Sequence, residues 1–318
     1  MNAAAPATVR SLIDEAARAL TDAGVAFGHG TTNAHDEAAW LVLWRLGLPL
    51  DADLDEAPPT DAGPTTLPPG ERAVPAEQAE AVRALVRERI ARRVPAAYLT
   101  REAWLQGLPF YVDERAIVPR SLIAELLVDG SIDPWLSEHT RHVLDLCTGN
   151  GSLAVIAASV YPEVSVVAAD ISTDALEVAR INVERHGLAD RIQVVASDAF
   201  SAVPGVFDLI VCNPPYVNAH SMAALPAEFR AEPALALAGG ADGMDFVRRL
   251  LREAPQHLSE HGVLVLEIGH ERAHFEAAFP RLEVVWLDTS AGADQVLLTT
   301  REALAQALLV AALSGAAR

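Results

Sequence analysis

The sequence predicts an α/β protein in which a small helical domain precedes a seven-stranded, mostly parallel sheet with an antiparallel edge hairpin. Apolar residues recur at a helical period through most of the first hundred residues. From Arg141 onwards, short apolar runs alternate with helical stretches, the pattern of a parallel sheet covered by helices on both faces. Only a short loop separates the last two runs, which favours an antiparallel hairpin at one edge.

Three helices are expected in the first part of the chain. The first covers Val9–Ala23, and the second follows Asn33, whose side chain can cap it, and ends at Gly47. The third covers Glu77–Arg93. Residues 51–76 are rich in proline, aspartate and threonine, which predicts a loop.

The polar face of the third helix carries a cluster of arginines, which is unusual in so acidic a chain. One interpretation is a solvated helix face. The other is a docking surface for RNA or for an acidic partner. The arginines are Arg83, Arg87, Arg89, Arg92 and Arg93.

Aromatic and β-branched residues around Gly107 and Pro109 predict a short hairpin between two domains. We therefore expect a helical domain over 1–97, a hairpin linker over 98–134 and a sheet domain over 135–318. The strands expected in the sheet are His142–Leu146, Val164–Ala169, Ile192–Ala196, Phe207–Cys212, Gly262–Ile268, Leu282–Leu287 and Gln295–Thr299.

Composition narrows the function classes. The 24 basic residues, all arginine, and 43 acidic residues give a net charge of −19. This charge argues against a free-standing nucleic-acid binder, because neutralising phosphates requires a basic surface. Two cysteines, Cys147 and Cys212, fit a reducing compartment and are expected to be small packing residues. Neither a signal peptide nor an apolar run of spanning length is expected, so we predict a soluble cytoplasmic protein.

The stretch VLDLCTGNGSLAV predicts a buried strand, a tight glycine turn and a helix. Gly149 and Gly151 allow unusual backbone conformations and let a ligand approach the main chain, although such a turn alone is weak evidence. Acidic residues Asp145, Asp170 and Asp198 follow or end successive strands, which meet at one edge of a parallel sheet. They predict a nucleoside site where Asp170 binds ribose hydroxyls and Asp198 accepts from a purine amine. Capping of the following helix is the alternative for Asp170 and Asp198.

The fourth strand runs into Asn213-Pro214-Pro215-Tyr216. The prolines stiffen the loop and remove backbone donors. The Asn213 side chain and the Pro214 carbonyl can accept the two N–H bonds of a planar NH₂ group, so that its lone pair points at an electrophile, and Tyr216 offers an aromatic face. The loop predicts group transfer to an amide or exocyclic amine, with a purely structural loop as the alternative.

Together these motifs resemble class I S-adenosylmethionine-dependent methyltransferases, Rossmann-like enzymes that modify adenine in nucleic acids or glutamine in proteins. YLTREAW, LPFYVDERAIVPRS and IAELL, within residues 98–127, resemble the linker of the protein-glutamine methyltransferases. VPRS at 118–121, FGHGTTNAHDEA at 27–38 and AGGADGMDFVRRLL at 238–251 are similar to the branch of that family that modifies ribosomal protein L-three rather than release factors.

The resemblance implies S-adenosylmethionine as cofactor and a glutamine of the basic ribosomal protein L-three as substrate, either free or in a ribosome assembly intermediate. From the residues themselves we expect no metal, no membrane and no sequence-specific nucleic acid as partner, and the resemblance assigns substrate recognition to the helical domain. It implies that Asn213, Pro214, Pro215 and Tyr216 hold the glutamine amide and that Phe110 and Glu125 line its pocket. The implied cofactor-binding residues are Asp145, Cys147, Thr148, Gly149, Asn150, Gly151, Asp170, Ile171, Asp198, Ala199 and Asn213.

Other functions stay open at this point. They are methylation of release factors, methylation of adenine in DNA or RNA, and a non-catalytic role in ribosome assembly. His270 and His274 flank Glu271 without the HExxH pattern, so surface histidines are expected rather than a metal site. Glu267 ends the fifth strand near the predicted site, either supporting it or acting as a cap.

Overall fold

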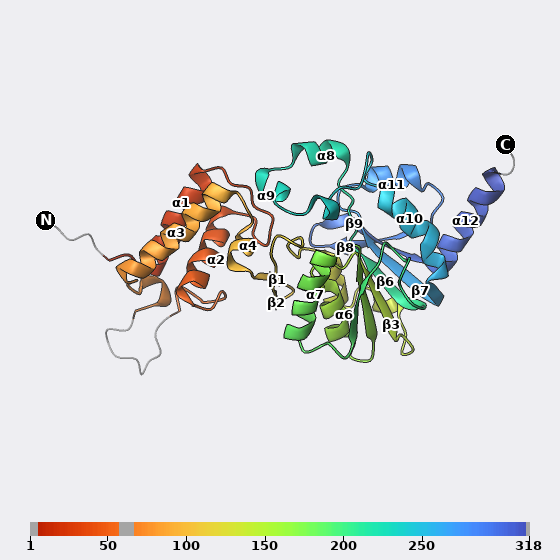
Figure 1. The fold of residues 1–318 in the computed structure, drawn as a ribbon, viewed down its shortest axis with the longest axis horizontal. Helices are drawn as coiled ribbons and strands as arrows, with labels where there is room; N and C mark the ends of the chain where they lie inside the picture. Colours follow the sequence, from red (N-terminus) through yellow and green to blue (C-terminus); the bar gives the residue numbers. More distant parts are fainter. Residues whose placement is uncertain (1–5, 57–66, 316–318) are drawn as a thin grey trace. The chain divides into compact units, whose positions relative to one another are not determined.

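The computed structural model describes residues 6–56 and 67–315, which divide into two compact units (Figure 1). The first unit contains the described residues up to Glu102 together with a short later segment, Pro226–Ala231. The second contains Ala103–Leu225 and the chain from Glu232 onwards. Residues 57–66 of the predicted proline-rich loop lie outside the described residues.

The first unit is a helical bundle built from α1 (Val9–Asp22), α2 (Ala34–Leu46), α3 (Ala76–Arg92) and α4 (Ala96–Thr100), with a 3₁₀ turn at Pro69–Glu71. Side-chain caps mark the starts of α1 and α2. The side chain of Asn33 accepts from the backbone N–H of Asp36 at 2.9 Å, and Thr8 and Ser11 form a reciprocal capping box. The apolar faces of the three long helices meet in one core, which includes Leu12, Ile13, Leu20, Leu41, Val82 and Val86.

The short helix α9 (Ala227–Arg230) belongs to this helical unit, because its Glu228 is fully buried beside α3. Arg89 of α3 has no exposed surface, and its Nε donates to Glu37 Oε1 at 2.9 Å. Its Nη1 donates to Glu228 Oε1 at 3.2 Å, and its Nη2 donates to the carbonyl of Ala26 at 2.9 Å. Arg89 is therefore a buried structural cation, and both interpretations of the arginine face are wrong for it.

The other arginines of that face are held by acidic side chains. Arg83 lies 2.8 Å from Glu15, Arg87 lies 2.7 Å from Glu80, and Arg92 lies 2.8 Å from Glu88, all at the surface. Arg93 Nη2 donates to Oε2 of the buried Glu228 at 3.3 Å. These surface ion pairs are those of a solvated helix face, and they favour that interpretation for Arg83, Arg87 and Arg92 over docking of RNA or of an acidic partner.

The second unit carries the predicted sheet. A hairpin of β1 (Ala103–Leu105) and β2 (Leu108–Phe110) precedes a seven-stranded sheet in the order β5-β4-β3-β6-β7-β9-β8. Its strands are β3 (His142–Leu146), β4 (Ser165–Asp170), β5 (Ile192–Ala196), β6 (Phe207–Cys212), β7 (Leu258–Glu267), β8 (Val285–Thr289) and β9 (Gly292–Thr300). Five strands are parallel, and β9 runs antiparallel to both β7 and β8. The Rossmann-like fold with an antiparallel edge hairpin is confirmed.

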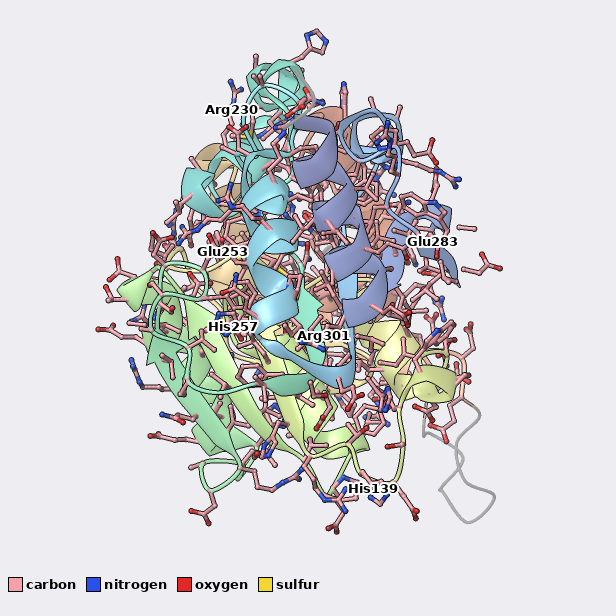
Figure 2. All side chains as sticks on the ribbon, turned by 90° about the vertical axis from the view of Figure 1, so that its right-hand side faces the viewer. His139, Arg230, Glu253, His257, Glu283 and Arg301 are labelled. Atoms are coloured by element: carbon pink, nitrogen blue, oxygen red, sulfur yellow. The ribbon has the colours of Figure 1, made fainter. Side chains whose placement is uncertain are left out.

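Helices cover both faces of this sheet because neighbouring strand residues point to opposite sides. Val143 contributes to the core shared with α5 (Ile123–Val128), α6 (Ser152–Val160) and α7 (Thr173–Arg185). Leu144 contributes to the core beneath α10 (Asp245–Glu253), α11 (Arg272–Ala278) and α12 (Arg301–Gly315). Figure 2 shows α10 and α12 side by side on that second face. Helix α8 (Ala219–Ala224) and 3₁₀ turns at Asp133–Trp135, Ala234–Ala236 and Ala254–Gln256 complete the unit.

The strand order reverses beside β3. The chain proceeds from β3 outward to β4 and β5, and then returns to place β6 on the other side of β3. Leu146 at the end of β3 pairs with Cys212 at the end of β6. This pairing brings the glycine turn and the Asn-Pro-Pro-Tyr loop together at the switch point where open α/β sheets bind ligands.

Among the helices of the described residues, none combines the length and the apolar character needed to cross a membrane.

Candidate active site

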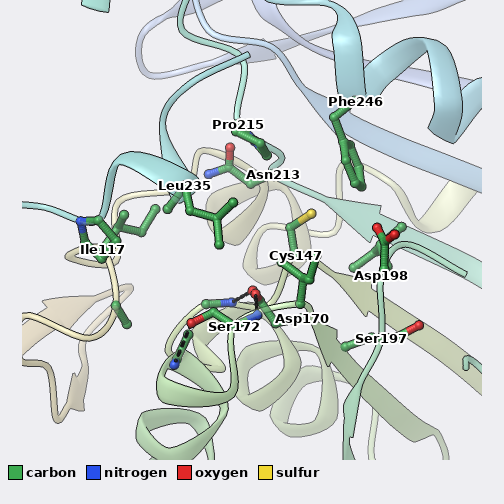
Figure 3. Close-up of a pocket in the computed structure, with 18 of the residues that line it drawn as sticks. Ile117, Cys147, Asp170, Ser172, Ser197, Asp198, Asn213, Pro215, Leu235 and Phe246 are labelled. Carbon is green, nitrogen blue, oxygen red and sulfur yellow. Dashed lines mark hydrogen bonds between the residues drawn. The ribbon is translucent and has the colours of Figure 1, made fainter. Parts of the chain in front are cut away.

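A pocket opens at the carboxyl ends of β3, β4 and β6, within the second unit (Figure 3). Its empty volume, including the part open to solvent, is about 850 Å³. The lining residues come from the linker, the strand ends, the start of α7, the segment at 233–236 and the first turn of α10. They are Arg115, Ala116, Ile117, Leu146, Cys147, Gly149, Ala169, Asp170, Ile171, Ser172, Ala175, Ser197, Asp198, Ala199, Asn213, Pro215, Pro233, Leu235, Ala236 and Phe246.

The glycine turn forms the floor of this pocket. Gly149 has a φ of +55°, which favours glycine, and a side chain added there would meet no atom within 4 Å. Glycine is therefore required by the backbone conformation, and its bare surface leaves the pocket side open. The backbone N–H of Gly149 donates to Asp170 Oδ2 at 2.9 Å, which ties the turn to the end of β4.

Four of the predicted cofactor-binding residues support the turn and do not line the pocket: Asp145, Thr148, Asn150 and Gly151. Asp145 is fully buried and accepts from Thr148 Oγ1 at 2.5 Å and from the N–H of Ala154 at 2.9 Å. The carbonyl of Asn150 accepts from the buried side chain of Asn182 at 2.8 Å. These bonds fix the shape of the loop from below, so we assign Asp145 to the turn and not to a direct ligand contact.

Asp170 has the geometry expected of a residue that binds a pair of hydroxyls. Its Oδ1 accepts from the N–H of Ser172 at 2.9 Å, and its Oδ2 accepts from Gly149. Each carboxylate oxygen keeps one further acceptor position. Burial raises the pKa of Asp170, while these backbone N–H groups favour its charged form. Ser172 caps α7, so helix capping is wrong as an explanation of Asp170. Ile171 is 53% exposed and adds an apolar pocket surface.

Asp198 lies at the end of β5 with its side chain 57% exposed. Arg249 Nη1 lies 2.5 Å from Asp198 Oδ1, and Arg249 Nη2 donates to the Asp198 carbonyl at 3.0 Å. Ser197 Oγ accepts from the N–H of Ala202, so Ser197 stabilises the turn that follows β5. Asp198 therefore faces the pocket with Oδ2 available, and Ala199 beside it lines the pocket.

Phe246 was not foreseen from the sequence. It lies in the first turn of α10 and reaches into the pocket on the side of Asp198 (Figure 3). Its aromatic face could flank a flat base, a role that the small side chain of Ala199 does not provide. The available signal was an aromatic residue at the start of a helix directly after the glycine-rich stretch AGGADGMD.

Asn213 and Pro215 line the same pocket as Gly149 and Asp170. No hydrogen bond joins the Asn213 side chain to any residue in the described ranges, so its oxygen is available to a ligand. Pro214 is buried. Tyr216 lies next to the lining and not in it, and its hydroxyl donates to Glu267 Oε1 at 3.4 Å.

The two cysteines lie at the ends of neighbouring strands, and only Cys147 lines the pocket. A hydrogen bond with the Cys212 thiol, followed by burial, raises the pKa of Cys147 well above its ordinary value. A protonated thiol is a poor nucleophile, which agrees with a packing role.

The structure does not bring Phe110 or Glu125 into the pocket. Phe110 is 1% exposed and packs in the core with Ile123, with its ring centroid 5.1 Å from that of His186. Glu125 accepts from the N–H of Ser290 at 2.6 Å. The hairpin directs Phe110 inward, where burial of the ring is more favourable than exposure at a pocket mouth.

The lining fits S-adenosylmethionine by its chemistry. Asp170 offers acceptors for a ribose, and Asp198 offers an acceptor for the amine of an adenine. Ile171 and Phe246 offer apolar surface for a flat base. The glycine turn offers a narrow backbone against which a chain the size of a methionine can lie.

We expect the buried Asp145 to make stability depend on pH. Burial raises the pKa of Asp145 to about 7 despite its hydrogen bonds to Thr148 and Ala154. Since this folded-state pKa exceeds the unfolded value, the contribution to stability is complete below about pH 4 and is lost as the pH rises through about 7. Asp145→Asn should therefore reduce the loss of unfolding free energy between pH 5 and pH 8 by about 1–3 kcal/mol.

Chemical denaturation at the two pH values measures this difference. Asp288→Asn, which removes an exposed acid, is the control and should follow the wild type. If the unfolding free energy of Asp145→Asn and that of the wild type changed equally between the two pH values, the pKa of Asp145 would not be raised in the folded protein.

Comparisons with known proteins find methyltransferases. A family model described as "Methyltransferase small domain" matches residues 125–240. The chain is 55% identical over 300 residues to the ribosomal protein uL3 glutamine methyltransferase of Bordetella pertussis, covering 93% of this chain and 96% of that protein. It is 51% identical to the protein of the same name from Burkholderia pseudomallei, covering 92% and 94%. A solved structure of the hMettl16 catalytic domain with an RNA hairpin aligns at a TM-score of 0.49 and 15% identity, covering 70% of this chain and 80% of that one.

Proposed function

The chain belongs to the family of ribosomal protein uL3 glutamine methyltransferases, and we propose that it methylates the side-chain amide nitrogen of a glutamine in uL3. It is an S-adenosylmethionine-dependent protein-glutamine methyltransferase. We further propose that it acts in the cytoplasm, on free uL3 or on an early assembly intermediate. The observation that best supports the proposed chemistry is that Asn213 and Pro215 share one pocket with Gly149 and Asp170.

The proposed mechanism uses orientation and charge stabilisation. S-adenosylmethionine supplies a methyl group activated by a positively charged sulfur. The Asn213 side-chain oxygen and the Pro214 carbonyl accept the two N–H bonds of the glutamine amide, which directs its lone pair toward that methyl group. These two acceptors also stabilise the positive charge that develops on the nitrogen. A proton then leaves the nitrogen to solvent, and no strong base is required.

The direct test uses the purified chain, labelled S-adenosylmethionine and three substrates: unmethylated uL3, a peptide chain release factor and total nucleic acid. We expect label in uL3 and a gain of about 14 daltons on one glutamine-containing peptide by mass spectrometry, the mass of one methylene. If label appeared only in the release factor or only in nucleic acid, that molecule and not uL3 would be the substrate. Label in none of the three would favour a non-catalytic role.

The net charge predicts a salt effect on substrate binding. A chain of charge −19 attracts a basic ribosomal protein, and salt screens that attraction. Between 50 and 300 mM salt we expect KM for uL3 to rise by about tenfold, and affinity for S-adenosylmethionine to change by less than about twofold. Steady-state kinetics and calorimetry measure the two quantities. If KM for uL3 did not change with salt concentration, the negative charge of the chain would not contribute to uL3 binding.

A further inference from the structure

Glu267, the last residue of β7, lies beside the catalytic loop and is only 4% exposed. Its Oε2 accepts from the Ser121 hydroxyl at 2.6 Å and from the N–H of Leu122 at 2.9 Å. Its Oε1 accepts from the Tyr216 hydroxyl at 3.4 Å. One buried carboxylate therefore receives donors from two segments of the second unit that are far apart in the sequence, the linker before α5 and the loop after β6.

The Tyr216 ring is confined on the side of this carboxylate. Gly269, two residues after Glu267, has a φ of +53°, and a side chain added there would lie 2.5 Å from the Tyr216 ring. The next backbone group is also fixed, because the N–H of Val217 donates to the carbonyl of Leu237 at 2.8 Å. The ring can therefore occupy a narrow range of positions, and the direction of its hydroxyl is set by Glu267.

The partners of Glu267 are all donors, which suits an ionised carboxylate because it only accepts hydrogen bonds. Burial raises the pKa of Glu267, and the bonds from Ser121 and Leu122 oppose that rise. The hydrogen bond from Tyr216 is long for an O–H···O contact, so it contributes direction more than binding energy. Glu267 acts partly as a helix cap, because it accepts from the N–H of Leu122, the residue directly before α5. Capping of α5 does not account for its contact with Tyr216, which comes from a different segment.

We propose that Glu267 is a positioning residue for methyl transfer. It acts by holding the Tyr216 side chain at a fixed position relative to the linker at Ser121–Leu122. The inference rests on the proposed function, because it requires that the Asn213–Tyr216 loop holds the glutamine amide, with Tyr216 flanking it as the family resemblance implies. A displacement of about 1 Å in such a group costs on the order of 100-fold in rate, so a carboxylate that touches neither substrate nor cofactor can control turnover.

The test is a double-mutant cycle on Tyr216 and Glu267, with kcat on uL3 and affinity for S-adenosylmethionine as readouts. Glu267→Gln should lower kcat by about 10- to 100-fold and change cofactor affinity by less than about twofold. In a Tyr216→Phe background, the same substitution should lower kcat by no more than about threefold, because its target hydroxyl is already gone. Additive losses, or a fall in cofactor affinity as large as the fall in kcat, would overturn the inference.

Amide hydrogen exchange tests the same link without turnover. Glu267→Gln should speed exchange both at Leu122 and at Tyr216–Val217. The matched control is Glu260→Gln, an exposed acid on the same strand, which should change neither segment. Faster exchange at Leu122 alone would overturn the link to Tyr216. If the wild type fails to methylate uL3, the proposed function fails, while the exchange data still decide the role of Glu267.

Discussion

Replacing Asn213 by alanine should lower kcat for uL3 methylation by about 1,000-fold and leave affinity for S-adenosylmethionine within about threefold of the wild type. Asn213 lines the pocket, and no hydrogen bond from the described residues occupies its side chain. The substitution removes one of the two acceptors that hold the amide, and with it part of the stabilisation of the developing positive charge. Cofactor contacts at Gly149 and Asp170 remain, which is why binding should survive.

Stopped-time assays with labelled cofactor measure kcat, and calorimetry measures cofactor affinity. Asn213→Asp keeps an acceptor oxygen and should retain more activity than the alanine variant. Asn33→Ala is the matched control, since it removes the cap of α2 and should cost about 1 kcal/mol of stability without changing kcat. Turnover near the wild-type rate in Asn213→Ala would exclude the proposed mechanism.

The second large effect concerns stability. Arg89→Met should reduce the unfolding free energy of the helical unit by about 3–5 kcal/mol, because it leaves Glu37 and Glu228 buried without their shared cation. Burial already raises the pKa of Glu37, and the charge of Arg89 opposes that rise. Arg93 still pairs with Glu228, so the loss should fall mainly on Glu37.

Denaturant unfolding followed by circular dichroism measures this loss. Arg87→Met on the same helix is the control, because Arg87 and Glu80 are 62% and 60% exposed, and it should cost less than about 0.5 kcal/mol. Adding Glu37→Met to Arg89→Met should recover much of the stability, as apolar replacement of a buried ion pair often does. A double variant no more stable than Arg89→Met would show that packing, not charge, explains the loss.

Local pattern was enough to predict the sheet. The bounds expected for β3, β5 and β6 match the observed strands. For β3 and β6 the reason is their burial within the sheet, which leaves a nearly continuous apolar run, whereas β5 lies at the edge and is only partly buried. The acids at Asp170 and Asp198 and the loop at Asn213 were placed correctly at the pocket for a related reason, since parallel strands end at a common edge.

Contacts between distant residues were not predictable in this way. Arg89 pairs with Glu37 and Glu228 at separations of 52 and 139 residues, so nothing local distinguishes it from the exposed arginines of α3. Phe246 reaches the pocket only because α10 packs over the sheet. The prediction that Phe110 lines the pocket was wrong. A family resemblance indicates which residue type stands at a position, but not the direction in which the strand points its side chain.

The helical unit is built from two segments that are far apart in the chain, and this affects how it folds during synthesis. Arg89 is synthesised early, but its partner Glu228 follows 139 residues later. At a rate of about 5–20 residues per second, the ribosome needs about 7 to 28 seconds to supply it. During that interval Arg89 can pair with Glu37 but not yet with Glu228. The N-terminal bundle should therefore mature after most of the sheet-forming chain has emerged, so translation order and folding order differ.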